Sequence, residues 1–268
     1  MSDDKISLHN LHRQFGSTEL YLSPLGLGTV KLGRNTSVKY PTSFQIPDDN
    51  AAADLIAHAH ALGINLIDTA PAYGSSEERL GNLLRGQRHD WVICTKVGEE
   101  FDNGVSHFDF SAAHTRRSIE RSLQRLQTDY LDIVLIHSDG NDLSIIDNGE
   151  ALNVLARCKQ EGLIRAYGMS TKTVAGGIAA AQHSDAVMAT YNSEYTDERP
   201  VLDYCAAHRK GVLIKKAFAS GHTTDTASAL RNVLKQPGVT SIIVGTINPQ
   251  HLQQNVAIAF SADSDSAN

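Results

Sequence analysis

The chain has 268 residues, of which 41% are hydrophobic and 20% are charged, so it is long enough to bury a sizeable core. Its formal net charge is −6 at pH 7, and no block of lysine and arginine interrupts the sequence. This excludes a general nucleic-acid binder, because such a protein needs clustered basic side chains to neutralise phosphates.

Short apolar segments rich in β-branched residues recur along the chain, and each of them predicts a strand. A β-hairpin is expected before them, in residues 6–21. Several segments are unbroken apolar runs, such as Ile242-Ile243-Val244, which is typical of strands covered on both faces in a parallel sheet. In chain order the predicted strands cover residues 25–29, 65–68, 91–95, 131–136, 164–170, 186–190, 212–215 and 241–244.

Amphipathic stretches lie between these strands. Residues 51–62 and 118–126 repeat apolar side chains at spacings of three and four, which predicts helices with one buried face. Glycines follow three of the predicted helices, at Gly63, Gly162 and Gly211, and indicate where those helices end.

Eight strands that alternate with helices predict an α/β fold of the TIM type, a (β/α)8 barrel whose N-terminal hairpin closes the barrel bottom. A doubly wound open sheet is the alternative that this pattern leaves open. No domain boundary is apparent, so we expect residues 1–268 to form one domain. The Ser/Asp-rich tail, residues 261–268, is expected to be disordered.

The cysteines and the N-terminus indicate a compartment. Cys94, Cys158 and Cys205 are widely spaced and form no C-x-x-C pair, so we expect neither a disulfide framework nor a zinc site. The N-terminal residues lack the apolar core of a signal peptide. No apolar run approaches the roughly 18 residues that a membrane helix needs. We therefore expect a cytoplasmic protein that contains no metal and binds neither nucleic acid nor membranes.

Ionisable residues stand where the predicted strands end, which is where barrel enzymes carry their catalytic groups. Asp68 ends the second strand and Tyr73 follows it, Lys96 follows the third strand, and His137 follows the fourth. Each of these four residues could have a structural role instead of a catalytic one; Asp68, for example, could cap the following turn. Their joint placement on adjacent strands nevertheless predicts one site on one rim of the barrel.

These four side chains suit the addition of hydride to a carbonyl group. An ion pair between Asp68 and Lys96 is expected, and a lysine close to the Tyr73 hydroxyl lowers a pKa that is normally near 10. Tyr73 then becomes a candidate proton donor, and His137 can hydrogen-bond the same substrate oxygen. No nucleophile elbow and no metal-ligand cluster point to other chemistry.

One segment carries a family resemblance. Residues 63–77, GINLIDTAPAYGSSE, followed by Leu80-Gly81, resemble the signature of the aldo-keto reductases. The similarity extends over residues 25–255, and the chain looks like a short bacterial-type member.

The resemblance implies both an activity and a catalytic tetrad. The expected activity is NAD(P)H-dependent reduction of aldehydes and ketones, a reversible reaction of small molecules. The tetrad falls on Asp68, Tyr73, Lys96 and His137. In this interpretation Tyr73 protonates the carbonyl oxygen while hydride arrives from nicotinamide C4.

The resemblance also implies an NADP(H) site across the barrel mouth, with NAD(H) as the alternative. The pyrophosphate is expected over the loop after the seventh strand, where two lysines and small residues suit phosphates. The adenosine is expected at a helix that begins after Asn248. The residues expected to contact the cofactor are Gly28, Thr29, Ser170, Thr171, Met188, Lys215, Lys216, Ala217, Phe218, Ala219, Ser220, Gly221, Gly245, Thr246, Asn248, His251, Gln254 and Asn255.

The chain departs from the family pattern at several residues that are expected to contact the cofactor. Many members hold the 2′-phosphate of NADP with Arg or Lys where this chain has Gly245 and His251, which leaves the choice between NADP and NAD open. Lys215 stands where an aromatic residue commonly stacks on nicotinamide. Thr171 and Met188 stand at two carboxamide contacts where Asn and Gln are usual.

Two other functions compete with a reductase. A cofactor-binding barrel that acts as a sensor or regulatory subunit is one, although it need not retain all four tetrad residues. A Schiff-base aldolase with Lys96 as nucleophile is the other, and Asp68 opposes it by keeping that lysine protonated. The physiological substrate and the oligomeric state stay open, with a monomer favoured.

Overall fold

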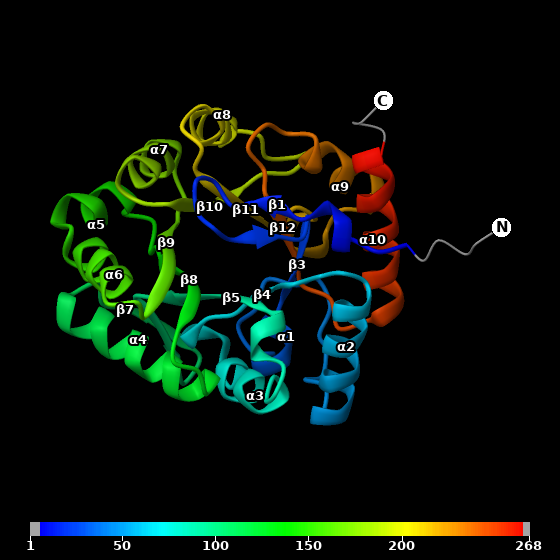
Figure 1. Ribbon diagram of the computed structural model, residues 1–268, viewed down its shortest axis with the longest axis horizontal. Coiled ribbons are helices and arrows are strands. Elements are labelled where there is room, and N and C mark those ends of the chain that lie inside the picture. The colour runs from blue at the N-terminus through cyan, green and yellow to red at the C-terminus, as the bar shows by residue number, and fades with distance from the viewer. Residues whose placement is uncertain (1–5, 265–268) are drawn as a thin grey trace.

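The computed structural model describes residues 6–264, and its centre is a closed barrel of eight parallel strands (Figure 1). Each strand pairs in parallel with the next one in the barrel, and the last strand pairs with the first. Each predicted strand overlaps one of the eight, which confirms the (β/α)8 barrel and excludes the open sheet. The barrel strands are β3 (Leu25–Gly28), β4 (Leu66–Asp68), β5 (Val92–Val97), β8 (Leu131–His137), β9 (Ile164–Ser170), β10 (Ala186–Thr190), β11 (Gly211–Lys215) and β12 (Ser241–Val244).

The helices surround the strands as an outer ring (Figure 1). They are α1 (Val30–Gly33), α2 (Asp49–Ala61), α3 (Ser76–Leu83), α4 (Ala112–Leu126), α5 (Asp142–Asn148), α6 (Glu150–Gln160), α7 (Val174–His183), α8 (Arg199–Ala207), α9 (Thr226–Leu234) and α10 (Pro249–Ser264). Single 3-10 turns lie at η1 (His9–Leu11), η2 (Pro71–Tyr73), η3 (Arg88–Asp90) and η4 (Ala219–Gly221). Across residues 6–264 no helix combines the length and the apolar character needed to cross a lipid bilayer.

Helix ends follow local capping chemistry. The predicted helices at 51–62 and 118–126 correspond to α2 and α4, but α4 begins earlier because the Ser111 side chain accepts a hydrogen bond from the His114 N–H. Gly63 and Gly162 have positive φ after their helices, as expected. The expectation for Gly211 was wrong, because α8 ends at Ala207 and the left-handed residue that follows it is Arg209, with φ of 50°.

The C-terminal segment differs from the predicted disordered tail. Helix α10 continues to Ser264, and Ala259 and Ala262 on it are buried. Residues 261–264 are therefore helical, because the apolar face of α10 extends past the point where Ser and Asp dominate the sequence. The rest of the predicted tail, residues 265–268, lies outside the described residues.

The predicted N-terminal hairpin is present and closes one end of the barrel. Strands β1 (Arg13–Gln14) and β2 (Tyr21–Leu22) pair antiparallel. The hairpin inserts Phe15 into the barrel, and a Cβ at Gly211 would lie 2.4 Å from the Phe15 ring, so the first residue of β11 leaves room for it. The interior cluster contains Phe15, Leu20, Leu22, Leu66, Val92, Cys94, Ile133, Leu135, Ala166, Ala186, Met188 and Leu213. Alternate strand residues face the helices instead, as the period of a strand requires.

A second hairpin lies at the end of the barrel opposite the N-terminal hairpin. Strands β6 (Glu99–Asp102) and β7 (Val105–Phe108) pair antiparallel between β5 and α4, and no predicted element corresponds to them. Gly98, with φ of 96°, turns the chain from β5 into this hairpin. The hairpin carries an acidic residue, Glu99, at this end of the barrel.

Candidate active site

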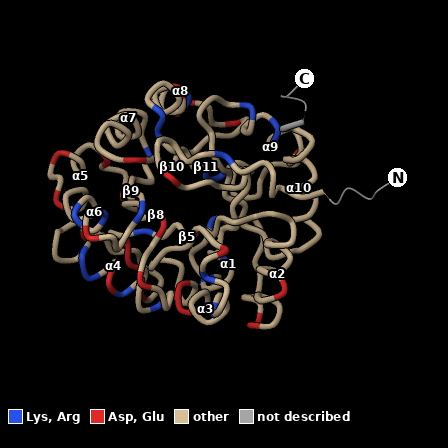
Figure 2. The backbone as a smooth tube through the Cα atoms, in the orientation of Figure 1, with Lys and Arg blue, Asp and Glu red and all other residues tan. Residues whose placement is uncertain are grey.

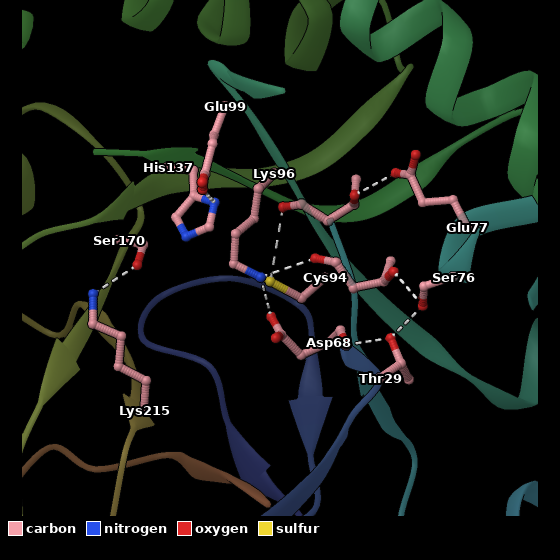
Figure 3. A network of polar contacts seen from close by, with 12 residues as sticks. Thr29, Asp68, Ser76, Glu77, Cys94, Lys96, Glu99, His137, Ser170 and Lys215 are labelled. Atoms are coloured by element: carbon pink, nitrogen blue, oxygen red, sulfur yellow. Dashed lines mark hydrogen bonds and ion pairs between the residues drawn. The ribbon is translucent and has the colours of Figure 1, made fainter. Parts of the chain in front are cut away.

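Three of the four predicted catalytic side chains come from barrel strands that lie side by side (Figure 3). Asp68 ends β4, Lys96 lies near the end of β5, and His137 ends β8. Lys96 Nζ donates to Asp68 Oδ1 at 2.6 Å and to the Thr69 carbonyl oxygen at 2.9 Å. The side chains of the pair are 1% and 5% exposed, so the predicted ion pair is formed and is removed from water.

Tyr73 reaches this group from the 3-10 turn η2, which two glycines hold in place. Gly74 has φ of 62°, in the left-handed region that favours glycine. A Cβ on Gly33 would lie 2.2 Å from the Tyr73 carbonyl oxygen. Only a glycine at the end of α1 therefore lets the tyrosine turn pack so closely against it.

A buried chain of hydroxyl groups ties the same turn to the barrel. Thr69 Oγ1 donates to Ser76 Oγ at 3.0 Å, Ser76 Oγ donates to Thr29 Oγ1 at 2.8 Å, and Thr29 Oγ1 donates to the Asp68 carbonyl oxygen at 2.8 Å. Figure 3 shows Thr29 and Ser76 of this chain to the right of Asp68. The residues that gave the sequence its family resemblance thus support the Asp68 backbone.

The Tyr73 ring lies beside the cation of Lys96 and the ring of His137. Lys96 Nζ is 5.0 Å from the Tyr73 ring centroid, and the His137 ring meets it edge to face with centroids 6.3 Å apart. Burial raises the pKa of Tyr73 above its ordinary value of 10, Lys96 opposes the rise, and Asp68 adds to it. Lys96 lowers the pKa of Tyr73 as expected, but the net direction is upward, because burial penalises the phenolate more than Lys96 stabilises it.

The protonation states suit a proton donor. Burial lowers the pKa of Lys96, but Asp68 and Tyr73 outweigh that and hold it above 10.5, so the ammonium stays charged. Tyr73 keeps its proton at neutral pH for the reason given above. A protonated phenol beside a fixed ammonium can release its proton to an oxygen that becomes an alkoxide.

Glu99 is a site residue that the sequence analysis missed. Its Oε2 lies 2.6 Å from His137 Nδ1 (Figure 3), and its Oε1 accepts a hydrogen bond from Ser106 Oγ at 2.6 Å. Burial raises the pKa of Glu99, but His137, Ser106 and Arg34 outweigh this and lower it to about 2. The sequence signal was the pair Glu99-Glu100 just past the third strand exit.

Lys215 extends from the end of β11 towards β9. Its Nζ donates to Ser170 Oγ at 2.8 Å and to the Thr171 carbonyl oxygen at 2.7 Å. Burial lowers the pKa of Lys215 to about 7, against the opposing effect of Glu198 and with the help of Lys216. This lysine therefore fixes Ser170, the one predicted carboxamide contact that matches the family pattern.

A cavity of about 630 Å³ opens at this end of the barrel. Small-molecule sites typically measure roughly 300–1,000 Å³. Asp68, Tyr73, Lys96 and His137 all line it. It is also lined by predicted cofactor residues, namely Gly28, Ser170, Met188, Lys215, Lys216, Ala217, Phe218, Ser220, Gly221, Gly245, Thr246, His251, Gln254 and Asn255. The structure thus brings the predicted catalytic residues and most predicted cofactor residues to one cavity.

Four predicted cofactor residues do not line the cavity. Thr29 is fully buried and supports Asp68, and Thr171 is buried with its N–H on the Met188 carbonyl. Ala219 forms part of the η4 turn. Asn248 faces the start of α10, where its Oδ1 accepts from the N–H groups of Gln250 and His251.

The cavity wall has features that fit a dinucleotide. In the loop after β11, left-handed backbone recurs at Lys216, Ala219, Ser220 and Gly221, with φ of 57°, 46°, 59° and 96°. Successive left-handed residues can form anion-binding concavities, although the N–H groups of Ala219 and Gly221 already donate to the Lys216 and Phe218 carbonyls. A Cβ at Gly245 would lie 2.8 Å from the Tyr40 hydroxyl oxygen, so bare backbone forms the wall there.

The charge of the cavity fits phosphate groups as well. The basic side chains that line it are Lys31, Arg34, Lys39, Lys96, Lys172, Lys215 and Lys216. Figure 2 shows lysine and arginine positions beside β5 and β11 at the middle of the barrel as well as on the outer helices. A chain with a net charge of −6 thus concentrates cations where an anionic ligand would bind. Among the described residues no group of three His, Cys, Asp or Glu side chains could hold a metal ion.

Comparison with known proteins identifies the family. A model of the Aldo/keto reductase family matches residues 24–228. The uncharacterized oxidoreductase YqkF of Bacillus subtilis (strain 168) is 27% identical over 293 residues, which covers 92% of this chain and 90% of that protein. The NADH-specific methylglyoxal reductase of Escherichia coli (strain K12) is 36% identical over 166 residues, covering 57% and 49%. The L-galactose dehydrogenase of Arabidopsis thaliana is 38% identical over 165 residues, covering 59% and 47%. The chain is thus aligned with about half the length of these two relatives.

Solved structures show the same similarity across the whole fold. A crystal structure assigned to the aldo-keto reductases, from Pseudomonas aeruginosa, has 59% sequence identity and a TM-score of 0.89, covering 96% of this chain and 97% of that one. The holo form of an aldo-keto reductase from Bacillus halodurans has 26% identity and a TM-score of 0.78, covering 95% of each chain.

Proposed function

This chain belongs to the aldo-keto reductase family and is an oxidoreductase, and from that premise we propose that it reduces aldehydes and ketones at the Tyr73–Lys96–Asp68–His137 site with NADPH. The observation that carries the proposal is the convergence of a protonated tyrosine and a buried Lys96–Asp68 ion pair on one cavity. Both groups face a space large enough for a cofactor and a small substrate.

The side chains divide the work of proton transfer. Tyr73 donates its proton to the carbonyl oxygen, and the raised pKa keeps that proton in place until charge develops on the oxygen. The Lys96 ammonium, fixed by Asp68, stabilises the tyrosinate that remains. His137 lies edge to face with Tyr73 and orients the reacting oxygen. A bound nicotinamide would supply the hydride.

The cofactor would be held by the loop after β11 and by the start of α10. Lys216 and the left-handed backbone of residues 216–221 suit the pyrophosphate. Gln254 and Asn255 line the cavity on α10 and suit the adenosine end. Ser170, anchored by Lys215, suits the carboxamide.

NADP(H) is proposed over NAD(H) because the cavity holds more cations than a pyrophosphate needs. His251 lies on α10 at the cavity wall, where it can face a 2′-phosphate. Replacing His251 with Arg should tighten NADPH binding relative to NADH, measured as the two dissociation constants by fluorescence titration. Equal changes in both dissociation constants would show that His251 does not contact the 2′-phosphate.

The decisive experiment follows absorbance of the reduced nicotinamide with a panel of aldehydes. We expect turnover with NADPH, slower turnover with NADH, and neither without an aldehyde. Cofactor binding without turnover on any aldehyde would favour the sensor or regulatory alternative, which the intact tetrad disfavours. The Lys96 aldolase is disfavoured because that amine is protonated and fixed on Asp68.

Two further expectations belong to this proposal. Cys94, Cys158 and Cys205 are free and buried, which suits the reducing environment of a cytoplasmic location. The barrel occupies residues 25–244, and the segments on both sides pack against it, so we propose that the whole chain is one domain.

A further inference from the structure

Two lysines that line the cavity differ in the groups that hold them. Lys96 Nζ lies 2.6 Å from the Asp68 carboxylate, which compensates its charge. Lys215 Nζ donates instead to two neutral oxygens, Ser170 Oγ at 2.8 Å and the Thr171 carbonyl oxygen at 2.7 Å. Figure 3 shows the Lys215 amine turned towards Ser170, while the Lys96 amine points to Asp68. Lys215 therefore presents an amine to the cavity whose hydrogen-bond partners carry no charge.

The surroundings of Lys215 favour its neutral form. Burial lowers its pKa to about 7 with help from Lys216 and Lys96, although Glu198 and Asp142 act in the opposite direction. About half of the molecules then have a neutral amine near pH 7. A neutral amine has two hydrogens and one lone pair. The two neutral acceptors match the two hydrogens and leave the lone pair unused.

The requirements for imine formation separate the two lysines. A lysine attacks a carbonyl carbon when burial or a neighbouring cation keeps its amine neutral. Lys96 does not meet this requirement, because Asp68 holds its ammonium. Lys215 meets it, because it is desolvated and is followed in the chain by Lys216. The requirement that disfavours an aldolase based on Lys96 therefore selects Lys215.

We propose that Lys215 captures small aldehydes as imines when the cofactor is absent, which gives the cavity a carbonyl-reactive group besides Tyr73. Nζ bonds to the carbonyl carbon, both carbon–oxygen bonds of the carbonyl break, and the oxygen leaves as water with the two hydrogens of the amine. The step transfers no electrons between reactants, so it needs no oxidant, reductant or cofactor, and water reverses it. Capture goes beyond the proposed reduction and does not require that the chain reduces the same aldehydes.

Capture and cofactor binding exclude each other at this position. Ser170, which accepts a hydrogen bond from Lys215, is the group proposed to hold the nicotinamide carboxamide. An adduct on Nζ fills the space beside Ser170. This second part of the inference rests on the proposed function, and it predicts that a protein alkylated at Lys215 binds NADPH weakly.

Reductive trapping tests capture without turnover. Cofactor-free protein is incubated at pH 7 with propanal and sodium cyanoborohydride, which converts an imine into a stable secondary amine, and peptide mass spectrometry maps the alkylated lysines. The comparison lysine is Lys235, which is exposed at the end of α9. We expect Lys215 to react on the order of ten-fold faster than Lys235, because an amine with a pKa near 10.4 is neutral in only roughly one molecule in 2,500. Lys96 should stay unmodified. Alkylation of Lys235 with an unmodified Lys215 would overturn the proposal.

Matched variants test the exclusion of cofactor. Lys215→Arg retains a cation and hydrogen-bond donors but forms no imine, and Lys235→Arg is the same change on the surface. Circular dichroism establishes that both variants fold. Trapping should weaken NADPH binding by about ten-fold or more in the unaltered protein and in Lys235→Arg, because the adduct removes at least one polar contact and blocks the site. The same treatment should leave the NADPH affinity of Lys215→Arg unchanged.

The outcomes separate the two proposals. An equal loss of NADPH affinity in all three trapped proteins would assign the loss to other lysines and refute the exclusion. Failure of the untreated protein to reduce any aldehyde would refute the proposed function instead, while the map of alkylated lysines would still decide whether Lys215 captures aldehydes.

Discussion

Removing the partner of a buried lysine should destabilise the fold strongly. In Asp68→Asn the Lys96 ammonium keeps its contact with the Thr69 carbonyl but loses the carboxylate 2.6 Å away. Because Lys96 is 1% exposed, water cannot replace that charge. Breaking a buried pair of this kind costs about 3–5 kcal/mol of unfolding free energy, whereas replacing both partners with apolar residues is often neutral.

Equilibrium unfolding in urea at pH 7, followed by far-ultraviolet circular dichroism, measures the effect. Asp203→Asn is the matched control, because Asp203 pairs with Arg199 on the exposed face of α8 and should change nothing measurable. The double variant Asp68→Leu with Lys96→Met should recover most of the stability that Asp68→Asn loses. A loss below about 1 kcal/mol in Asp68→Asn, the range of exposed pairs, would refute the idea that this ion pair is isolated from water.

Three further changes test the packing and the electrostatics of the barrel. Phe15→Ala should leave a cavity inside the barrel and lower the free energy of unfolding by about 3–5 kcal/mol in urea titrations. A smaller loss would mean that the hairpin is not part of the core. Gly81→Ala should destabilise the protein although alanine favours helices, because its Cβ would lie 2.0 Å from the Arg125 carbonyl oxygen; a raised melting temperature would contradict this contact. Glu99 has a folded-state pKa of about 2 against an ordinary 4.5, so its stabilising contribution is present above pH 4.5 and is lost as the pH falls towards 2. Glu99→Gln should therefore flatten the stability profile between those pH values, and parallel profiles would contradict the shift.

The fold could be predicted because parallel barrel strands leave a strong pattern. Segments such as residues 133–136 are apolar on both faces, since one set of side chains fills the barrel and the other meets the helices. The extent of α10 was harder to predict, because Ala259 and Ala262 carry a weak apolar signal among polar neighbours. Segment 99–108 was missed because its strands are short and mostly polar.

The site could be predicted in part for a related reason. Asp68, Lys96 and His137 stand at strand ends, and in a parallel barrel strand ends share one rim. Glu99 stands beyond a strand end on an inserted hairpin, and its contact with His137 depends on how that hairpin folds back. The direction of the Tyr73 pKa could not be predicted either, because it depends on the balance of burial, Lys96 and Asp68 in three dimensions.

The anchoring of Ser170 by Lys215 illustrates the same limit. The resemblance placed Lys215 where an aromatic ring is usual, and nothing in its sequence neighbourhood pointed to β9. The strands β9, β10 and β11 are consecutive in the barrel, so a long side chain at the end of β11 can reach Ser170 across β10. Only the pairing of these three strands brings the two side chains within 2.8 Å.

The most direct measurement of the central claim is NADPH-dependent aldehyde reduction by Tyr73→Phe, together with its NADPH dissociation constant. Loss of a proton donor costs about 10²–10⁴-fold in kcat/KM, whereas the cofactor contacts proposed for the β11 loop and α10 do not involve the Tyr73 hydroxyl. We therefore predict a fall of that size with cofactor affinity nearly unchanged. Turnover close to that of the unaltered protein would contradict the account.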